Sequence, residues 1–375
     1  MKTIQPASQL TNRSKLAVAP DINAQTIGEL ANELSGLSAF EDYQKLKSEN
    51  TLIAQHRDLK LFGRFLNGIF DKADGTEMET GFRVKSGQLY HDPAGWKLVT
   101  HGLVKLFKVQ LENEGHSLTS INRILSTVRK YADLATSAGY IDPVNNLMIQ
   151  NVKGYLGSEA RHVDSRRAVT RKSGQKEEPV QIPKHIIVEL KSEETYDANA
   201  VGARNRVIMC FCLDHGLRAS EIAGLKLSEI DLESGLFRVY RPKTNTFDLL
   251  RLSKDTSMAL EVYLQYDLPP LPHLENGTLL RAAHGKGALR EKPVSRTTVS
   301  QTVNKYGKLM AIKHNIPSLE KLSSHDGRHQ WATDVLRSGA QIDQLQQAGG
   351  WKSPAMPLRY VNRRKIANDG IELDR

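Results

Sequence analysis

The stretch LSSHDGRHQWATDVL, residues 322–336, decides how the second half of the chain is interpreted. It places His325, Asp326, Arg328 and His329 within five positions, after two serines and at the start of an amphipathic pattern. Residues three or four apart share one face of a helix, so His325 can act beside either Arg328 or His329. The pattern predicts a helix whose first turn holds a metal ion, holds a phosphate group, or is only a polar helix end.

A metal site is the first alternative, because two histidines four residues apart resemble the HExxH pattern of zinc proteases. Asp326 is one methylene shorter than the glutamate that such enzymes use as base, and Arg328 adds a fixed positive charge between the two ligands. Gly327 is also a poor residue for a helix that must hold ligands rigidly. A third ligand is not evident, so we expect neither a metal nor another cofactor.

A phosphate site suits these residues better. Arg328 offers a planar fork of donors that matches two phosphate oxygens, and His325 on the same face can donate to a third. The helix N-terminus adds partial positive charge where the anion would lie. We interpret Asp326 and His329 as residues of the helix start or of the surroundings of the site, since the helix dipole favours the Asp326 carboxylate.

Composition favours a folded protein with a polyanionic partner. The 375 residues exceed what one hydrophobic core usually supports, so two domains are expected. The net charge of +10 favours a polyanionic partner, although a generally soluble surface also explains it. No stretch has the length and apolarity of a signal peptide or a membrane span, which predicts a cytoplasmic protein without membrane contact. The two cysteines, Cys210 and Cys212, lie in an apolar run and are expected to be buried thiols.

The pattern of apolar residues divides the chain. Residues 1–22 form a polar tail that we expect to be flexible, and residues 23–152 are a succession of helices. Two of these helices have apolar residues at helical spacing. These residues are Leu59, Phe62, Leu66 and Phe70 in the first helix, and Ile121, Ile124, Leu125, Val128 and Ala132 in the second. Ser117 is a suitable N-cap for the second helix, and Gly139 ends it.

Residues 153–179 contain few large apolar side chains and many basic ones, so we expect a flexible basic linker there. The second domain, residues 180–375, mixes element types. A helix is expected to end at Gly216, and two alternating runs flank Thr244 and Asn245 as a small hairpin. Further helices are expected around the HDGRH stretch.

Residues with useful chemistry follow one another through this second domain. Arg218 follows a helix end, and Glu221, one turn on, can hold its guanidinium group. Lys243 lies at the tip of the hairpin, and Trp351 and Tyr360 follow a glycine-rich helix end. Singly, a solvated lysine, a packed tryptophan or a half-buried tyrosine is the simpler explanation. As an ordered set on a basic chain, these residues favour chemistry on a phosphate.

The ordered set resembles the tyrosine recombinases of the phage integrase family, over residues 183–365. That family has an arginine in a GLRxSE-like turn, a hairpin lysine, an HxxR pair, a histidine or tryptophan after a glycine-rich helix end, and a tyrosine nucleophile. The matching residues here are Arg218, Lys243, His325, Arg328, Trp351 and Tyr360. The helices of the first half are similar to the core-binding domain of the family. The resemblance implies a mostly α fold with a helical N-terminal core-binding domain and a mainly helical α+β catalytic domain that contains a small antiparallel sheet.

Two departures from the family pattern affect the expected chemistry. Most relatives carry histidine where Trp351 stands, and an indole N–H can donate to a phosphate oxygen but cannot shuttle a proton. His325 and Lys243 would then carry more of the proton transfer. Pro354 and Pro357 closely precede Tyr360, so the helix of the nucleophile is expected to start late.

The resemblance implies a site-specific recombinase that acts in DNA integration or excision without a metal or ATP. Tyr360 would form a 3′-phosphotyrosyl bond, and Arg218 and Arg328 would stabilise the transition state, assisted by His325 and Trp351. Lys243 would protonate the departing 5′-oxygen. Two alternatives remain open at this point: a type IB topoisomerase with similar residues, and a noncatalytic DNA-binding regulator with the same fold.

The resemblance also implies partners. It predicts double-stranded DNA clamped between the two domains and four protomers in the recombination synapse, with a monomer or dimer in the free state. Accessory DNA-bending proteins and association with the nucleoid are further expectations. The residues after Tyr360 are expected to make subunit contacts. Arg123, Arg129 and Lys130 share one side of a predicted helix, which either lies along the DNA backbone or is simply a solvated face.

Overall fold

The chain divides into two compact units, residues 1–175 and 176–375. The computed structural model describes residues 24–74, 83–156, 163, 179–242, 245–266, 277–284 and 287–361. The expected tail, most of the expected linker and the residues after 361 lie outside this description. Over the part of the chain that is described, no helix combines the length and the apolar character needed to cross a bilayer.

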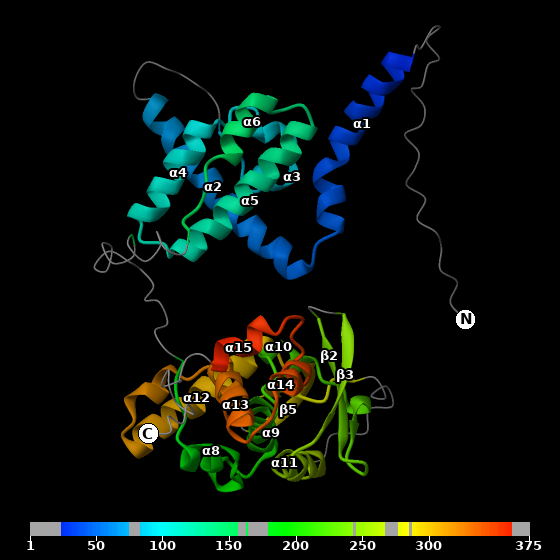
Figure 1. Cartoon of the computed structure of the whole chain (residues 1–375), viewed down its shortest axis with the longest axis vertical. Helices are drawn as coiled ribbons and strands as arrows, with labels where there is room; N and C mark the ends of the chain where they lie inside the picture. The colour runs from blue at the N-terminus through cyan, green and yellow to red at the C-terminus, as the bar shows by residue number, and fades with distance from the viewer. Residues whose placement is uncertain are drawn as a thin grey trace, which may run out of the picture. The chain divides into compact units, whose positions relative to one another are not determined.

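The first unit is a helical bundle (Figure 1). Its elements are α1 (Ala24–Lys45), α2 (Glu49–Asp74), α3 (Gln88–His91), η1 (Pro93–Trp96), α4 (His101–Asn113), α5 (Leu118–Ser137) and α6 (Pro143–Gln150). α5 packs against α1, α2, α4 and α6, so it is the central helix of the bundle.

The sequence pattern explains both long helices of this unit. Ser117 is the N-cap of α5 and accepts a hydrogen bond from the Ser120 N–H at 3.3 Å, and Gly139 follows the helix with a φ of +77°. The five apolar residues expected to face the core from α5 are all buried. On α2, Leu59, Phe62 and Leu66 are buried as well, and the side chain of Phe70 lies outside the description. Both predicted helices are therefore confirmed.

The second unit mixes helices with two small sheets. Its helices are α8 (Lys184–Lys191), η2 (Glu193–Thr195), α9 (Ala200–Asp214), α10 (Ala219–Gly224), η3 (Leu227–Glu229), α11 (Lys254–Gln265), α12 (Arg296–His314), η5 (Pro317–Lys321), α13 (Ser324–Arg337), α14 (Ile342–Gly349) and α15 (Ala355–Val361). Its strands are β1 (Ile230–Asp231), β2 (Leu236–Arg241), β3 (Thr246–Arg251), β4 (Arg281–His284) and β5 (Ala288–Pro293).

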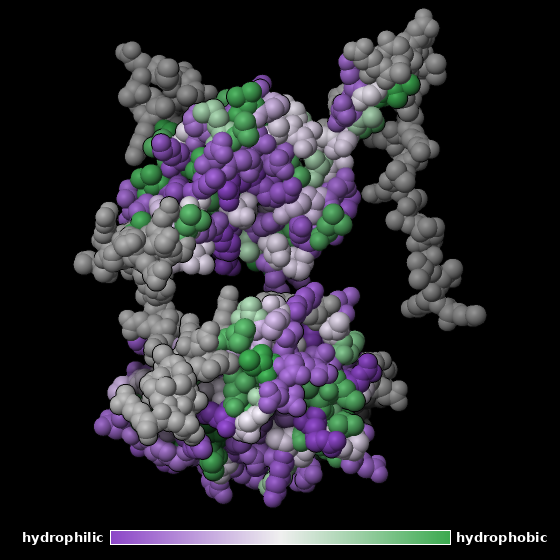
Figure 2. Space-filling view, viewed as in Figure 1, coloured by the Kyte–Doolittle hydropathy of each residue, from purple (hydrophilic) through white to green (hydrophobic). Residues whose placement is uncertain are grey.

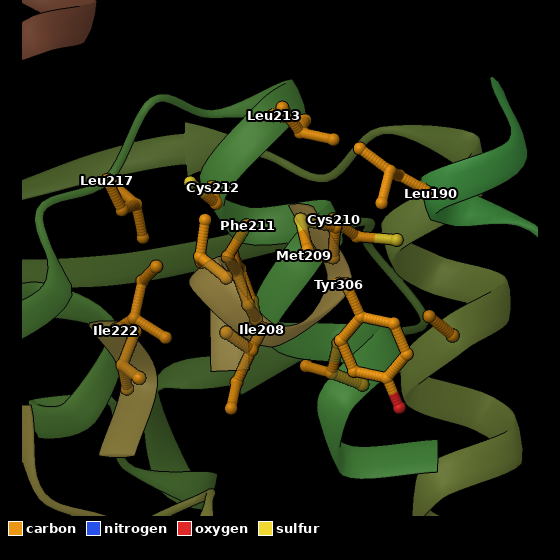
Figure 3. Close-up of a cluster of buried hydrophobic side chains, with 14 of the residues drawn as sticks. Leu190, Ile208, Met209, Cys210, Phe211, Cys212, Leu213, Leu217, Ile222 and Tyr306 are labelled. Carbon is orange, nitrogen blue, oxygen red and sulfur yellow. The ribbon is translucent and has the colours of Figure 1, made fainter. Parts of the chain in front are cut away.

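The core of this unit is built around α9, whose residues from Gly202 to Leu213 are all buried. A helix that is covered on every side must be surrounded by other elements, and α8, α11, α12 and α13 pack against it. Figure 3 shows Leu190, Leu217, Ile222 and Tyr306 gathered around the α9 side chains. Cys210 and Cys212 belong to this core, and burial raises the pKa of each thiol to about 12.

The sheets are antiparallel. The first has the strand order β1-β2-β3, with Arg241 opposite Thr246 at the hairpin end, and β4 pairs with β5 in the second. Asn245, in the turn between β2 and β3, has a φ of +56°, which asparagine tolerates better than most residues. The predicted fold class, mostly helical with small antiparallel sheets, is confirmed.

Candidate active site

The turn between α9 and α10 places Arg218. Gly216 ends α9 with a φ of +57°, and a Cβ at this position would lie 2.2 Å from the Trp331 ring. Only glycine satisfies both the conformation and the space. The turn is therefore packed directly against α13, and Arg218 follows it as the N-cap of α10.

Glu221 fixes the direction of the Arg218 side chain. One Glu221 carboxylate oxygen accepts from the Arg218 guanidinium at 2.6 Å, and the other accepts from the Arg218 backbone N–H at 2.8 Å. The Glu221 side chain is only 1% exposed, whereas that of Arg218 is 27% exposed. The anchor is therefore buried and the cation reaches the surface.

The start of α13 is shaped by Asp326 and Gly327. Asp326 accepts from the backbone N–H and the hydroxyl of Ser323 at 2.9 and 2.6 Å, which completes a capping box, and from the Val180 N–H at 3.2 Å. A Cβ on Gly327 would lie 2.4 Å from the Cys212 sulfur. The glycine that looked unsuitable for a helix therefore allows α13 to approach α9 closely.

Arg328 joins two turns of the site. Its guanidinium donates to the Gly216 carbonyl at 2.7 Å and to the Gly349 carbonyl at 2.5 Å. The residue is 2% exposed, and its Cζ lies 4.2 Å from the centre of the Trp351 ring, a cation–π contact. Arg328 thus holds the turn that leads to Arg218 against the turn that leads to Trp351.

Trp351 is buried and stacks on Trp331, with ring centroids 6.2 Å apart. Its position depends on the glycine pair that ends α14. Gly350 has a φ of +60°, and a Cβ on Gly349 would overlap the Trp351 ring at 2.0 Å. The tryptophan is consequently wedged between α13 and the end of α14.

His325 is exposed in the first turn of α13, and it meets His329 one turn later. Their Nε2 atoms are 3.0 Å apart, and the rings are nearly perpendicular. A separation of 3.0 Å is a hydrogen-bond distance, so one ring donates to the other. His329, which the sequence suggested only as a neighbour of the site, is therefore in direct contact with a candidate catalytic histidine.

The remaining two candidates are Tyr360 and Lys243. Tyr360 lies in the last turn of α15, which begins directly after Pro354 and packs against α13 and α14. Pro357 falls in the first turn of α15, where proline is tolerated. Lys243 lies outside the described residues, two positions after the end of β2.

Arg241 bonds to the residues that surround Arg218 and Trp351, and it was missed in the sequence. It is 1% exposed and bonds to Glu221, to Asp248 and to the Ala348 carbonyl at 2.8, 2.8 and 2.9 Å. A signal was present, because the alternation along β2 places Arg241 on the same buried face as Phe237 and Val239. A charged residue on the buried face of a strand requires buried partners for its charge.

The three DNA-binding candidates of the first unit all have partners within the protein. Arg123 pairs with the buried Asp58 carboxylate, which also accepts from the Thr127 hydroxyl. Lys130 pairs with Asp133 at 3.2 Å on the exposed side of α5. Arg129 donates to the Gln150 carbonyl at 3.5 Å. Each side chain thus has a structural role whether or not it contacts DNA.

The first turns of α13 carry the His325 and His329 rings and the Arg328 guanidinium, which bonds to the turn before Arg218. Among the described residues, no three histidine, cysteine or acidic side chains gather in a way that could hold a metal ion. Fixed cationic donors of this kind stabilise negative charge that develops on a substrate.

Comparisons with known proteins match much of the chain, including most of the second unit, to one family. The model of the phage integrase family matches residues 185–366. The chain is 27% identical over 259 residues to tyrosine recombinase XerD of Proteus mirabilis, and the aligned region covers 68% of this chain and 71% of that protein. It is 26% identical over 258 residues to tyrosine recombinase XerA of Pyrococcus horikoshii, which covers 68% of this chain and 78% of the relative.

Solved structures show the same fold. The Tn1549 transposon integrase in complex with transposon right end DNA has a TM-score of 0.57 at 13% identity, covering 90% of this chain and 97% of that chain. A lambda integrase dimer bound to a COC′ core site has a TM-score of 0.53 at 16% identity, covering 96% of this chain and 85% of that chain.

Proposed function

The chain belongs to the phage integrase family of tyrosine recombinases through residues 185–366, and from this premise we propose that it cleaves and rejoins DNA at specific sites through a 3′-phosphotyrosyl intermediate. The observation that supports this most is the position of Arg328. Its bonds to the Gly216 and Gly349 carbonyls bring together the turns that carry Arg218 and Trp351, which are far apart in the sequence.

In the proposed reaction, the Tyr360 oxygen attacks a backbone phosphorus. An oxygen–phosphorus bond to the tyrosine forms, the bond to the 5′-oxygen breaks, and Lys243 supplies the proton that the 5′-oxygen needs. His325 accepts the proton of Tyr360. Rejoining runs the same steps backwards with a 5′-hydroxyl as the nucleophile, so the bond energy is conserved and no ATP is required.

Arg218 and Arg328 stabilise the charge that develops on the nonbridging oxygens. A preorganised donor of this kind typically lowers the barrier by about 3 kcal/mol, because it is already oriented before the reaction starts. The part of Arg218 that reaches the surface can meet a phosphate directly. Arg328 is more deeply placed, so it acts at the floor of the site, beside Trp351.

Double-stranded DNA is the proposed partner. The net charge of +10 supports it, and so does the similarity to integrases whose structures contain DNA. Arg123, Arg129 and Lys130 remain candidate contacts in the first unit. We further propose that four protomers assemble on two sites and that the residues after Tyr360 make the subunit contacts. Accessory DNA-bending proteins would assist the reaction, which would take place in the cytoplasm at the nucleoid.

The decisive experiment uses a nicked duplex that contains the recombination site. The wild type is expected to form a protein–DNA adduct that survives a denaturing gel, and the Tyr360→Phe variant is expected to bind DNA equally well without forming it. Because the proposed chemistry uses no metal, the adduct should form at the same rate in EDTA. An adduct with Tyr360→Phe would show that the nucleophile is another residue.

The same assay separates the alternatives. DNA binding without any wild-type adduct would favour a noncatalytic regulator. Relaxation of a supercoiled plasmid that lacks a cognate site would favour a type IB topoisomerase, since a recombinase exchanges strands only between paired sites. Strand exchange between two cognate sites, and its loss with Tyr360→Phe, is the outcome that we expect.

A further inference from the structure

Arg241 holds three elements of the second unit together at the end of strand β2. Its Nε donates to Asp248 on β3, one terminal nitrogen donates to Glu221 on α10, and the other donates to the Ala348 carbonyl near the end of α14. Three separate donors of one planar group are used in three directions. Arginine is suited to this role because its donors form a rigid fork, whereas the lysine ammonium is a point charge.

Two of these bonds, to Glu221 and to the Ala348 carbonyl, lead to a candidate catalytic residue. Glu221 is the carboxylate that fixes Arg218, and Ala348 lies just before the turn that carries Trp351. The backbone of Gly350 also approaches the guanidinium closely, since a Cβ there would lie 2.7 Å from the Arg241 Nε. Lys243 follows Arg241 by two residues in the chain.

The carboxylate of Glu221 is shared by two arginines. One of its oxygens accepts from the Arg218 side chain, and the other accepts from the Arg241 side chain and the Arg218 backbone N–H. Because Arg241 neutralises part of the carboxylate charge, Glu221 can orient Arg218 without cancelling its positive charge. Without Arg241, the buried carboxylate would draw the Arg218 guanidinium inward and weaken its field at the surface.

We propose that Arg241 is a positioning residue of the recombinase site, which holds Arg218 in place and preserves its charge through the shared Glu221 carboxylate while fixing the turn before Trp351. The inference rests on the proposed function, because it concerns the phosphate that Arg218 would stabilise. Arg241 acts through these neighbours and does not contact the DNA.

The test compares Arg241→Lys with a matched control, Arg238→Lys. Arg238 lies on the same strand but faces solvent, so the same chemical change there leaves the site untouched. We expect Arg241→Lys to bind DNA within about twofold of the wild type but to form the covalent adduct about 100-fold more slowly, since a shift of about 1 Å in a catalytic group has effects of that size. The control should retain the wild-type rate.

A double-mutant cycle with Arg218→Ala distinguishes positioning from general loss of structure. If Arg241 acts through Arg218, the Arg241→Lys change should slow adduct formation far less in the Arg218→Ala background than in the wild type. Rates that simply multiply would overturn the inference, as would an unchanged rate in Arg241→Lys alone. Thermal melts establish that each variant is folded at the assay temperature.

A milder variant tests the inference if Arg241→Lys does not fold. Asp248→Asn weakens the anchor of Arg241 from the β3 side and leaves Glu221 and Arg218 intact. It should slow the adduct in the same direction, with the same dependence on Arg218, and an unchanged rate in a folded protein would overturn the inference. If the wild type itself forms no adduct, the proposed function fails, which is a different result from a wild-type adduct that Arg241 does not affect.

Discussion

At the scale of single residues, Gly327 shows how closely the site depends on packing. The Gly327→Ala change places a Cβ within 2.4 Å of the Cys212 sulfur, so α13 must move away from α9. Overpacking of this kind typically costs about 1 to 3 kcal/mol. Urea unfolding of the full chain should therefore show a lower free energy of unfolding. Adduct formation should also slow, because His325 and Arg328 lie in the same turn of α13 as Gly327 and would move with it.

The Cys212→Ala change provides the control for this prediction. It removes the sulfur that the new methyl group would meet, so the double variant should be more stable than the sum of the two single effects predicts. Strictly additive losses would show that the overlap is relieved elsewhere and that the contact between Gly327 and Cys212 does not set the helix spacing.

His215 gives the protein a specific acid sensitivity. The ring is buried and hydrogen-bonded to the Thr256 hydroxyl at 3.0 Å, and burial lowers its pKa from 6.5 to about 4. Between these two values the unfolded chain binds a proton that the folded chain does not, so stability falls as the pH falls. The contribution of this residue should decrease by about 3 kcal/mol across that window and be constant above it.

The measurement is the free energy of unfolding at several pH values for the wild type and for His215→Gln, whose side chain stays neutral. The difference between the two curves isolates the histidine from the other titrating groups. A difference that does not change between pH 6.5 and 4 would contradict the assigned burial.

The order of residues along the chain suggested the candidate residues, but it could not show which contacts hold them in place. Arg218, His325 and Arg328 belong to short motifs, and a short motif can be recognised in the sequence without knowledge of the structure. Arg241 has no motif around it. Its role arises from Glu221, Asp248 and the Ala348 carbonyl, which meet only after folding. Sequence spacing cannot reveal a contact that depends on three elements packing together.

At the scale of elements, we propose the exposed side of α12 as a surface that contacts a DNA backbone. Thr297, Gln301, Lys305 and Lys308 follow one another on this side, and all are exposed. They belong to a shallow, largely open depression that Ser300 and Asn304 also line. The face offers several donors and two cations without an acidic residue, a composition that suits phosphate contacts.

We predict that Lys305→Ala and Lys308→Ala each weaken DNA binding and reduce the slope of the binding constant against salt concentration by about one on logarithmic scales. Titrations at several salt concentrations test this. Lys313→Ala on the same helix is the control, because its ammonium already pairs with Glu189 at 2.6 Å. An equal change in slope for the control would mean that α12 acts only through net charge.

Among the elements, the helices were easier to predict than the orientation of the strands. Apolar spacing located α2, α5 and α13, because the period of a helix fixes which side is buried. In β3 the alternating pattern predicts a strand but does not show which of its two faces is buried. Phe247 and Leu249 are exposed, and Asp248 lies on the inner side to meet Arg241. Figure 2 shows apolar residues at the surface over the β2–β3 hairpin, a feature that hydrophobicity alone would have turned inward.

At the scale of the whole molecule, the boundary between the two compact units falls within the linker that the sequence predicted. The boundary between residues 175 and 176 falls within the segment 153–179, whose composition predicts an exposed basic connection. The first residues of the segment pack on the first unit, since the Tyr155 backbone bonds twice to the Asn122 side chain at 2.8 Å. Composition could not show this attachment, because it depends on one amide on a neighbouring helix.

Brief digestion with trypsin should therefore cut after Lys or Arg in residues 157–179 and release two resistant fragments. The cut should precede any cleavage inside either unit, because folded backbone must open before it enters a protease. Mass spectrometry of the early fragments identifies the sites. Early cleavage within α5 or α9 would contradict the independence of the two cores.

The close approach of Gly327 to Cys212 also makes this native thiol a probe of how often α13 moves away from α9. Both cysteines of the chain are buried, and the high pKa of Cys212 leaves almost none of it as the reactive thiolate at neutral pH. We expect a maleimide or disulfide reagent to reach this sulfur during intervals when α13 separates from α9. The rate of labelling thus reports how often the floor of the site opens, and bound DNA that steadies the α13 turn should slow that rate without any probe being engineered into the protein.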